Sequence, residues 1–173
     1  MQPVTKKYCW YVLYTRCLHE GKAEEYLNRN SIEVYLPRHK VLRQWSDRKK
    51  WIEVPLFPSY IFVRVSCREY QKALQHHSIV KYITIGGCPC FVPDEQINAI
   101  KVLLNSQLKF EVIQESYEIG DSVVFCEGPL TGYSAEVINR KGEKELLLRI
   151  DGTQNALVIL SKCEYVKKSL LCS

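Results

Sequence analysis

Four side chains that could ligate a transition metal lie close together in the middle of the sequence. They are His76, His77, Cys88 and Cys90, and they fall within fifteen residues. Zinc sites usually place two ligands two to four residues apart at each end of a loop, and a Cys-Pro-Cys pair beside adjacent histidines fits that spacing poorly. We therefore expect no metal site here and no cofactor in the chain.

Sequence patterns of common enzyme classes are missing as well. The chain has no G-x-S-x-G, no G-x-x-x-x-G-K-[ST] and no H-E-x-x-H, and Gly86-Gly87 alone is too weak a signal for a phosphate-binding loop. We predict that the protein is not an enzyme.

The eight cysteines do not indicate a disulfide scaffold, because no C-x-x-C pair occurs and Met1 to Lys7 lack the apolar core of a signal peptide. No stretch approaches the roughly 20 apolar residues of a membrane helix. We expect reduced thiols, a cytoplasmic location and no membrane partner.

The basic residues are distributed unevenly along the chain and suggest binding to a negatively charged partner. Residues 1–107 carry 16 Lys and Arg against 9 Asp and Glu, a net charge of +7, whereas residues 108–173 carry 8 against 10, a net charge of −2. Lys and Arg set against phosphates release condensed counterions, so this excess favours a polyanion as the partner of the first part.

Strands and helices that alternate along the first part must position these side chains. Residues 8–15 indicate a buried strand, and residues 19–30 an amphipathic helix. Further strands are expected over 32–36, 38–45, 51–54, 59–65 and 79–85, and further helices over 67–77 and 93–107. The order β-α-β-β-β-α-β-α predicts an α+β fold, with helices packed on a sheet.

The last third of the chain has a different pattern. Short β-rich runs over 122–126, 134–139, 146–150 and 157–160 are separated by turn signals, which is typical of a small closed barrel. We expect domains at 1–107 and 117–173, joined by a linker at 108–116.

Three stretches, in this order, resemble the NusG family of transcription elongation factors. They are Trp10-Tyr11-Val12, Leu56 to Val63 (LFPSYIFV), and Gly120-Asp121 followed by Gly128 to Gly132 (GPLTG). The resemblance implies an N-terminal NusG domain, with a mainly antiparallel sheet flanked by helices, and a C-terminal all-β KOW barrel. The segment that begins at Pro55 is most similar to specialised paralogs such as RfaH and the UpxY regulators of polysaccharide operons.

The resemblance also implies a function: docking on the clamp helices of the largest RNA polymerase subunit, with suppression of pausing or termination in particular operons. Docking on a helical hairpin needs exposed aromatic anchors. The matching positions are Tyr14, Tyr60, Phe62 and Ile85. The alternating pattern of 59–65 allows these side chains to be core residues instead, and the resemblance favours the exposed interpretation.

Contact with the single non-template DNA strand is implied as well. The matching positions around the first helix are Arg16, Lys22, Arg29 and His77. Phosphate contacts of this kind position a protein and make its binding sensitive to salt. Exposed Lys and Arg on a helix are more often only solvated charges, and the same alternative holds for a second candidate, the basic tip Arg48-Lys49-Lys50 of the 38–54 hairpin.

Two positions depart from the RfaH pattern. Gln71-Lys72-Ala73 stands where RfaH has a His-Thr-Thr motif, and Val54 stands where it has the acid of an interdomain ion pair. A closed, helical C-terminal domain is therefore not predicted.

For the partners, the resemblance implies a monomer whose KOW domain binds a ribosomal protein or the Rho termination factor. The alternative is an RNA-binding or ribosome-associated KOW protein that does not contact the polymerase.

Overall fold

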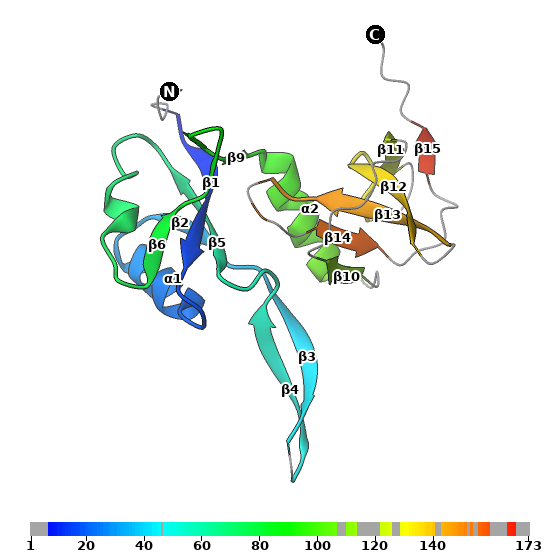
Figure 1. Cartoon of the computed structure of the whole chain (residues 1–173), viewed down its shortest axis with the longest axis horizontal. Coiled ribbons are helices and arrows are strands. Elements are labelled where there is room, and N and C mark those ends of the chain that lie inside the picture. Colours follow the sequence, from blue (N-terminus) through cyan, green and yellow to red (C-terminus); the bar gives the residue numbers. More distant parts are fainter. Residues whose placement is uncertain are drawn as a thin grey trace. The chain divides into compact units, whose positions relative to one another are not determined.

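The computed structural model divides into two compact units, Met1–Pro93 and Asp94–Ser173 (Figure 1). The residues that the structure describes are 7–45, 47–106, 110–113, 122–125, 129–140, 143–151, 153, 156–159 and 166–168. Among these residues, no helix has the length and apolar character needed to cross a membrane.

The first unit is built on an antiparallel sheet with the strand order β2-β5-β1-β6. Its strands are β1 (Cys9–Thr15), β2 (Glu33–Tyr35), β5 (Tyr60–Val65) and β6 (Ile79–Tyr82), and β9 (Phe91–Val92) pairs with β1 beside β6. The central pair is in register from Cys9 opposite Val65 to Tyr14 opposite Tyr60. The predicted α+β arrangement of a mainly antiparallel sheet with helices is confirmed for this part of the chain.

Helix α1 (Glu20–Arg29) packs on one face of this sheet. Its apolar side chains Ala23 and Leu27 are fully buried in one cluster with Leu13, Ile61 and Val63. Asn30 ends the helix, and its side-chain amide donates a hydrogen bond of 2.9 Å to the Tyr26 carbonyl. The amphipathic pattern of residues 19–30 thus predicts this helix to within a residue at either end.

The opposite face of the sheet is also apolar over most of its width. Val12 and Phe62, which lie opposite each other on β1 and β5, are fully buried on this face. Tyr35 of β2 continues the row, and burial raises the pKa of its phenol to about 12. Because both faces are covered, β1 is an almost uninterrupted apolar run rather than an alternating one.

Residues 67–85 differ from their predicted form. Instead of a helix over 67–77, the structure has a single 3-10 turn, η1 (Lys72–Leu74). The strand expected over 79–85 ends at Tyr82, and β7 (Thr84–Ile85) turns back into β8 (Cys88–Pro89). Gly86 and Gly87 make this tight turn possible, since both have positive φ angles (59° and 79°), as a two-residue hairpin loop of type I′ requires.

A long hairpin projects from the first unit (Figure 1). Strands β3 (Arg38–Gln44) and β4 (Lys49–Pro55) pair only with each other, in register from Arg38 opposite Pro55 to Gln44 opposite Lys49. The predicted hairpin is confirmed.

In the second unit, α2 (Asp94–Asn105) precedes a six-stranded antiparallel sheet with the order β10-β14-β13-β12-β11-β15. Its strands are β10 (Phe110–Ile113), β11 (Ser122–Phe125), β12 (Ser134–Arg140), β13 (Glu143–Arg149), β14 (Ala156–Ile159) and β15 (Val166–Lys168). The expected strands are present, but their closure into a barrel is not shown. The sequence predicts a linker over 108–116, whereas residues 110–113 form β10, which pairs with β14.

Candidate functional site

Two tyrosines form an aromatic pair at the end of the central strands. Tyr14 and Tyr60 lie directly opposite each other on β1 and β5, with ring centroids 5.6 Å apart in an edge-to-face arrangement. The side chain of Tyr14 is 37% exposed and that of Tyr60 is half-buried. The pair therefore presents aromatic surface to solvent from a position fixed by strand register.

A buried carboxylate fixes the backbone beside this pair. Glu20, in the first turn of α1, is 5% exposed, and its Oε1 accepts a hydrogen bond of 2.7 Å from the backbone N–H of Ser59. Ser59 has a φ of 66°, in the left-handed region that non-glycine residues rarely adopt. The Ser59 carbonyl in turn accepts a hydrogen bond of 2.8 Å from the N–H of Thr15. Glu20 thus connects α1 to Ser59, the residue that immediately precedes Tyr60.

Ile85 is a second exposed apolar residue of the first unit. It precedes the Gly86-Gly87 turn, and 64% of its side chain is exposed. The base of its hairpin is tied to β1 by a backbone hydrogen bond from Ile83 N–H to the Val12 carbonyl (2.9 Å) and is closed by a second one, from Cys90 N–H to the Ile83 carbonyl (2.8 Å). Ile85 is therefore displayed on a short hairpin rather than on a loose loop.

Phe62 is not an exposed anchor, and the expectation that it accompanies Tyr60 at the surface is wrong. Its side chain is fully buried, with ring centroids 6.1 Å from Phe57 and 6.3 Å from Tyr35. Tyr60 and Phe62 do share a face of β5, but Tyr60 begins the strand whereas Phe62 lies two residues further along, beside Tyr35 on β2. Position along the strand separates them, and the alternating pattern cannot show this.

A cluster of histidines gathers beside the first turn of α1. The rings of His76 and His77 are 4.3 Å apart, His19 lies 5.9 Å from His77, and Tyr26 stacks on His76 at 4.7 Å. Ser78 holds two of these rings: its N–H donates to His76 Nδ1 (3.3 Å), and its hydroxyl lies 3.4 Å from His19 Nδ1. This part of the surface therefore presents aromatic rings and the nitrogen atoms of the imidazoles.

Positive charge surrounds these rings. Arg16 and Lys22 are exposed, and the backbone N–H of Arg16 donates to the Ser78 carbonyl (2.9 Å). Desolvation, followed by the charges of His77, His19 and Lys22, lowers the pKa of His76 from its usual value of 6.5. We call Arg16, His19, Lys22, Tyr26, His76 and His77 the histidine face.

The structure brings three of the four predicted DNA-binding residues together. Arg16, Lys22 and His77 belong to the histidine face, whereas Arg29 lies in the last turn of α1, about 10 Å along the helix from Lys22 at 1.5 Å per residue and three residues after Tyr26. Arg29 forms an ion pair of 2.5 Å with Glu25, and both side chains are largely exposed. Arg29 is left out of the histidine face because its guanidinium pairs with Glu25.

Sequence reasoning missed His19 and Tyr26 as members of this face. His76 and His77 are adjacent in the chain, but His19 is separated from Ser78, which it contacts, by 59 positions. No local pattern signals that pairing, which arises because β1 and β6 are neighbours in the sheet.

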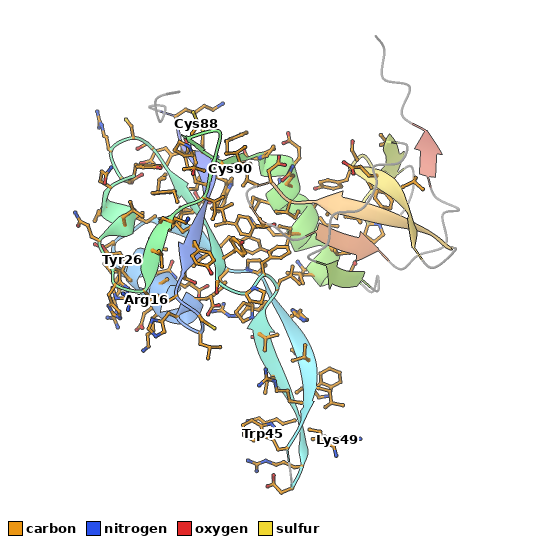
Figure 2. The ribbon with its side chains drawn as sticks, viewed as in Figure 1. Arg16, Tyr26, Trp45, Lys49, Cys88 and Cys90 are labelled. Carbon is orange, nitrogen blue, oxygen red and sulfur yellow. The ribbon has the colours of Figure 1, made fainter. Side chains whose placement is uncertain are left out.

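The four candidate metal ligands do not come together. Cys88 and Cys90 lie at the opposite end of the first unit from Tyr26, the ring that stacks on His76 (Figure 2). Among the residues that the structure describes, no group of three or more His, Cys, Asp or Glu side chains could hold a metal ion.

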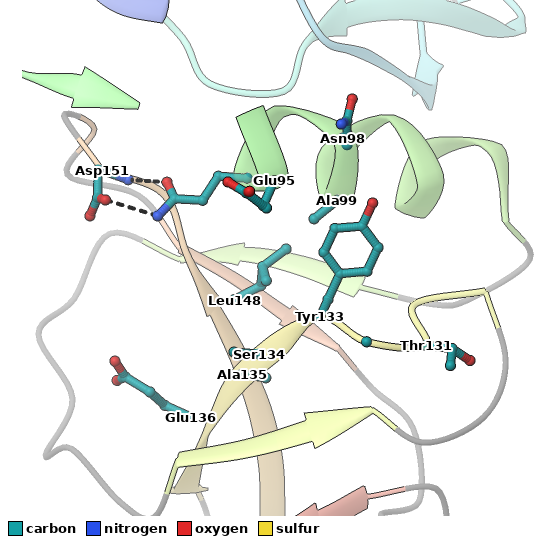
Figure 3. A pocket seen from close by; sticks show the side chains of 12 residues that line it. Glu95, Asn98, Ala99, Thr131, Tyr133, Ser134, Ala135, Glu136, Leu148 and Asp151 are labelled. Atoms are coloured by element: carbon teal, nitrogen blue, oxygen red, sulfur yellow. Dashed lines mark hydrogen bonds between the residues drawn. The ribbon is translucent and has the colours of Figure 1, made fainter. Parts of the chain in front are cut away.

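The second unit contains a cavity of about 620 Å³ between α2 and β12 (Figure 3). Gln96 closes one side through two hydrogen bonds with Asp151, from Gln96 Nε2 to Oδ2 (2.8 Å) and from the Asp151 N–H to Gln96 Oε1 (2.9 Å). Glu95 and Glu136 also line it. Three carboxylates disfavour a phosphate ligand, so we assign this cavity no part in nucleic-acid binding.

Comparison with known proteins shows what this chain is similar to. Residues 8–101 match the family model described as NusG, transcription termination factor nusG. Among solved structures, the one described as domain interaction in Thermotoga maritima NusG matches with a TM-score of 0.52 and 20% identity, over 94% of this chain and 97% of that chain. This likeness shows a common fold.

Two structures of the MjSpt4:Spt5 complex also match, in conformations A and B. Both have a TM-score of 0.30, with 16% and 18% identity over 92% and 88% of this chain, and each is covered over 97% of its own length. These two likenesses are too weak to carry an argument.

Proposed function

The chain belongs to the NusG family, and from this premise we propose that it is a transcription elongation factor whose first unit docks on RNA polymerase through Tyr14, Tyr60 and Ile85. The observation that carries the proposal is the exposed Tyr14–Tyr60 pair, with ring centroids 5.6 Å apart on adjacent strands. Aromatic anchors near the centre of an interface commonly dominate its binding energy.

The rigidity of this surface supports a docking role. Strand register places both tyrosines, the bond from Ser59 to Glu20 fixes the entry to β5, and the Gly86-Gly87 turn holds Ile85. Because side chains that are already ordered lose less entropy on binding, such a surface binds a partner at a lower entropic cost. We propose the clamp helices of the largest polymerase subunit as that partner.

We further propose that the histidine face contacts the non-template DNA strand. Exposed Arg16 and Lys22 offer phosphate contacts, and the stacked Tyr26 and His76 rings offer π surface beside them. The similarity of the segment from Pro55 to Val63 to specialised paralogs supports an antitermination role in particular operons. For the second unit, we propose a KOW domain that binds a ribosomal protein or Rho.

An RNA-binding or ribosome-associated protein without polymerase contact is the second candidate function. The exposed basic residues of the first unit favour it, since they suit any nucleic acid. The two functions differ in their dependence on Tyr14 and Ile85, which only docking requires.

Replacement of both exposed anchors tests the docking proposal. We expect Tyr14→Ala with Ile85→Ala to lower the affinity for RNA polymerase by about ten-fold or more, since a true hot spot contributes roughly 2 kcal/mol. The measurement is pull-down and biolayer interferometry with core polymerase, with circular dichroism to verify the fold.

Phe91→Ala is the matched control for this test. Phe91 is 51% exposed and lies opposite Tyr11, hence on the α1 face of the sheet, away from Tyr14. It should bind polymerase like the wild type. Wild-type affinity in the double variant would exclude docking through this surface and favour the second function.

Binding of single-stranded DNA by the histidine face should strengthen as the pH falls from about 7.5 to about 5.5. His76 has a lowered pKa, so it is neutral at pH 7.5. A phosphate bound nearby favours the protonated ring and raises that pKa, so protonation and DNA binding reinforce each other. The stability of the free protein changes in the opposite direction. Because the pKa of His76 is lower in the folded state, the unfolded state takes up a proton first below about pH 6.5, and the free energy of unfolding declines there.

The pH dependence is measured by fluorescence anisotropy with a labelled single strand at constant ionic strength. His76→Gln should flatten it, because an amide takes up no proton in this range. A slope that survives this replacement would assign the titration to other groups.

A further inference from the structure

The β3–β4 hairpin carries a second set of exposed aromatic and basic side chains that the docking surface and the histidine face do not use. Trp45 is 56% exposed, Trp51 63% and Leu42 48%. Trp45 and Lys49 lie at the far end of the hairpin (Figure 2). Large apolar side chains displayed in this way on a projecting ribbon usually mark an interaction site.

The charge of the hairpin indicates the kind of partner. Between residues 40 and 53 there are five basic residues against two acidic ones, a net charge of +3. Arg48 contacts Asp47 at 3.9 Å, but both side chains are largely exposed. Lys40, Arg43, Lys49 and Lys50 take part in no ion pair among the described residues. This surface complements a polyanion.

The hairpin is also held in a defined shape. Arg38, the first residue of β3, forms an ion pair and hydrogen bonds with Glu24 of α1, which raise the pKa of its guanidinium. The Leu56 N–H donates to the Pro37 carbonyl (2.8 Å), and the Trp45 N–H donates to the Arg48 carbonyl (2.8 Å) at the tip. Both ends of the ribbon are therefore fixed, and Trp51 is placed by its register opposite Leu42.

From these observations we propose that the β3–β4 hairpin is a binding site for single-stranded nucleic acid, with Trp45 and Trp51 stacking on bases and Arg43, Lys49 and Lys50 contacting phosphates. Exposed indole rings favour a single strand, because the faces of bases in a duplex are already stacked on one another. Aromatic stacking combined with basic side chains is the usual way in which proteins hold single strands. This site is separate from the docking surface and does not depend on polymerase binding.

The test measures the affinity of the full chain for labelled oligonucleotides of about 15 nucleotides by fluorescence anisotropy. The probes are oligo(dT), oligo(U) and a duplex of the same length, so that the arms distinguish DNA from RNA as the natural strand. We expect single strands to bind more tightly than the duplex, and Trp45→Ala or Trp51→Ala to weaken this binding about ten-fold each. Lys49→Ser with Lys50→Ser should lower the salt dependence by about 1.4 in log–log slope, at about 0.7 per contact.

Tyr8→Ala is the matched control, because Tyr8 is 50% exposed and precedes β1 rather than lying on the hairpin. A second readout is tryptophan fluorescence, which stacked bases should quench. Trp45→Phe with Trp51→Phe keeps two stacking rings but leaves Trp10, which is 4% exposed, as the sole indole. This variant should bind nearly normally but lose the quenching.

To distinguish binding by the hairpin from binding by the histidine face, the assay is repeated in a protein with Arg16→Ser and Lys22→Ser. The effects of the tryptophan variants should persist there. Binding of the duplex in preference to single strands, wild-type affinity in both tryptophan variants, or no oligonucleotide binding at low salt would each overturn the proposal, and the last would point to a protein partner instead.

Discussion

Phe62→Ala should lower the free energy of unfolding by about 3 to 5 kcal/mol, the range for truncation of a buried phenylalanine. The side chain of Phe62 is fully buried, and the ring meets Phe57 and Tyr35 at centroid distances of 6.1 and 6.3 Å. Its removal leaves a cavity beside these two aromatic rings. The cavity cannot close unless β5 moves, and that movement would disturb the paired strand β1. Such a loss is a large part of the 5 to 15 kcal/mol that stabilises a typical domain.

Urea denaturation followed by circular dichroism measures this effect, with Phe91→Ala as the control. Phe91 is 51% exposed, so the same truncation there should change stability by about 0.5 kcal/mol or less. A change below about 1 kcal/mol for Phe62→Ala would show that the face carrying Phe62 is not a packed core. The result bears on function, because loss of polymerase binding in a Phe62 variant reports unfolding, whereas the same loss in a Tyr14 variant reports docking.

The comparison of these two aromatic positions shows how far sequence can predict this molecule. Alternation places Tyr60 and Phe62 on one face of a strand, and the structure agrees. Whether that face is covered depends on what packs over each position, which is tertiary information. The alternating pattern therefore predicts the shared face correctly and leaves the exposure of each side chain open, and the exposed position of Phe62 that the resemblance implies is wrong.

The candidate sites show the same limit. The hairpin and its basic tip follow from a polar run between two β-rich segments, which is local information. The histidine face instead requires β6 to lie beside β1, so that residues near 19 meet residues near 77. Glu20 gives no sequence signal either, because an acidic residue in the first turn of a helix is normally exposed and stabilises the helix dipole.

Glu20→Ala should destabilise the protein by about 2 kcal/mol, since hydrogen bonds to charged groups contribute about 1.5 to 3 kcal/mol. The Glu20 carboxylate is 5% exposed and accepts the Ser59 N–H at 2.7 Å. Without it, a buried N–H has no acceptor, and Ser59 loses the contact that holds its φ at 66°. The measurement is again urea denaturation, and Glu20→Gln should recover part of the loss because it keeps an acceptor oxygen of similar reach.

A second consequence separates positioning from simple stability. Ser59 precedes Tyr60, so its relaxation should move one ring of the exposed pair, and polymerase affinity at a temperature where the variant is fully folded should fall for Glu20→Ala and return with Glu20→Gln. Glu25→Ala is the matched control on the same helix, since Glu25 is 61% exposed and pairs only with Arg29 among the described residues. If Glu20→Ala loses stability but keeps full affinity, Ser59 does not position the docking surface. If it loses neither, the buried bond between α1 and β5 makes no net contribution to the fold.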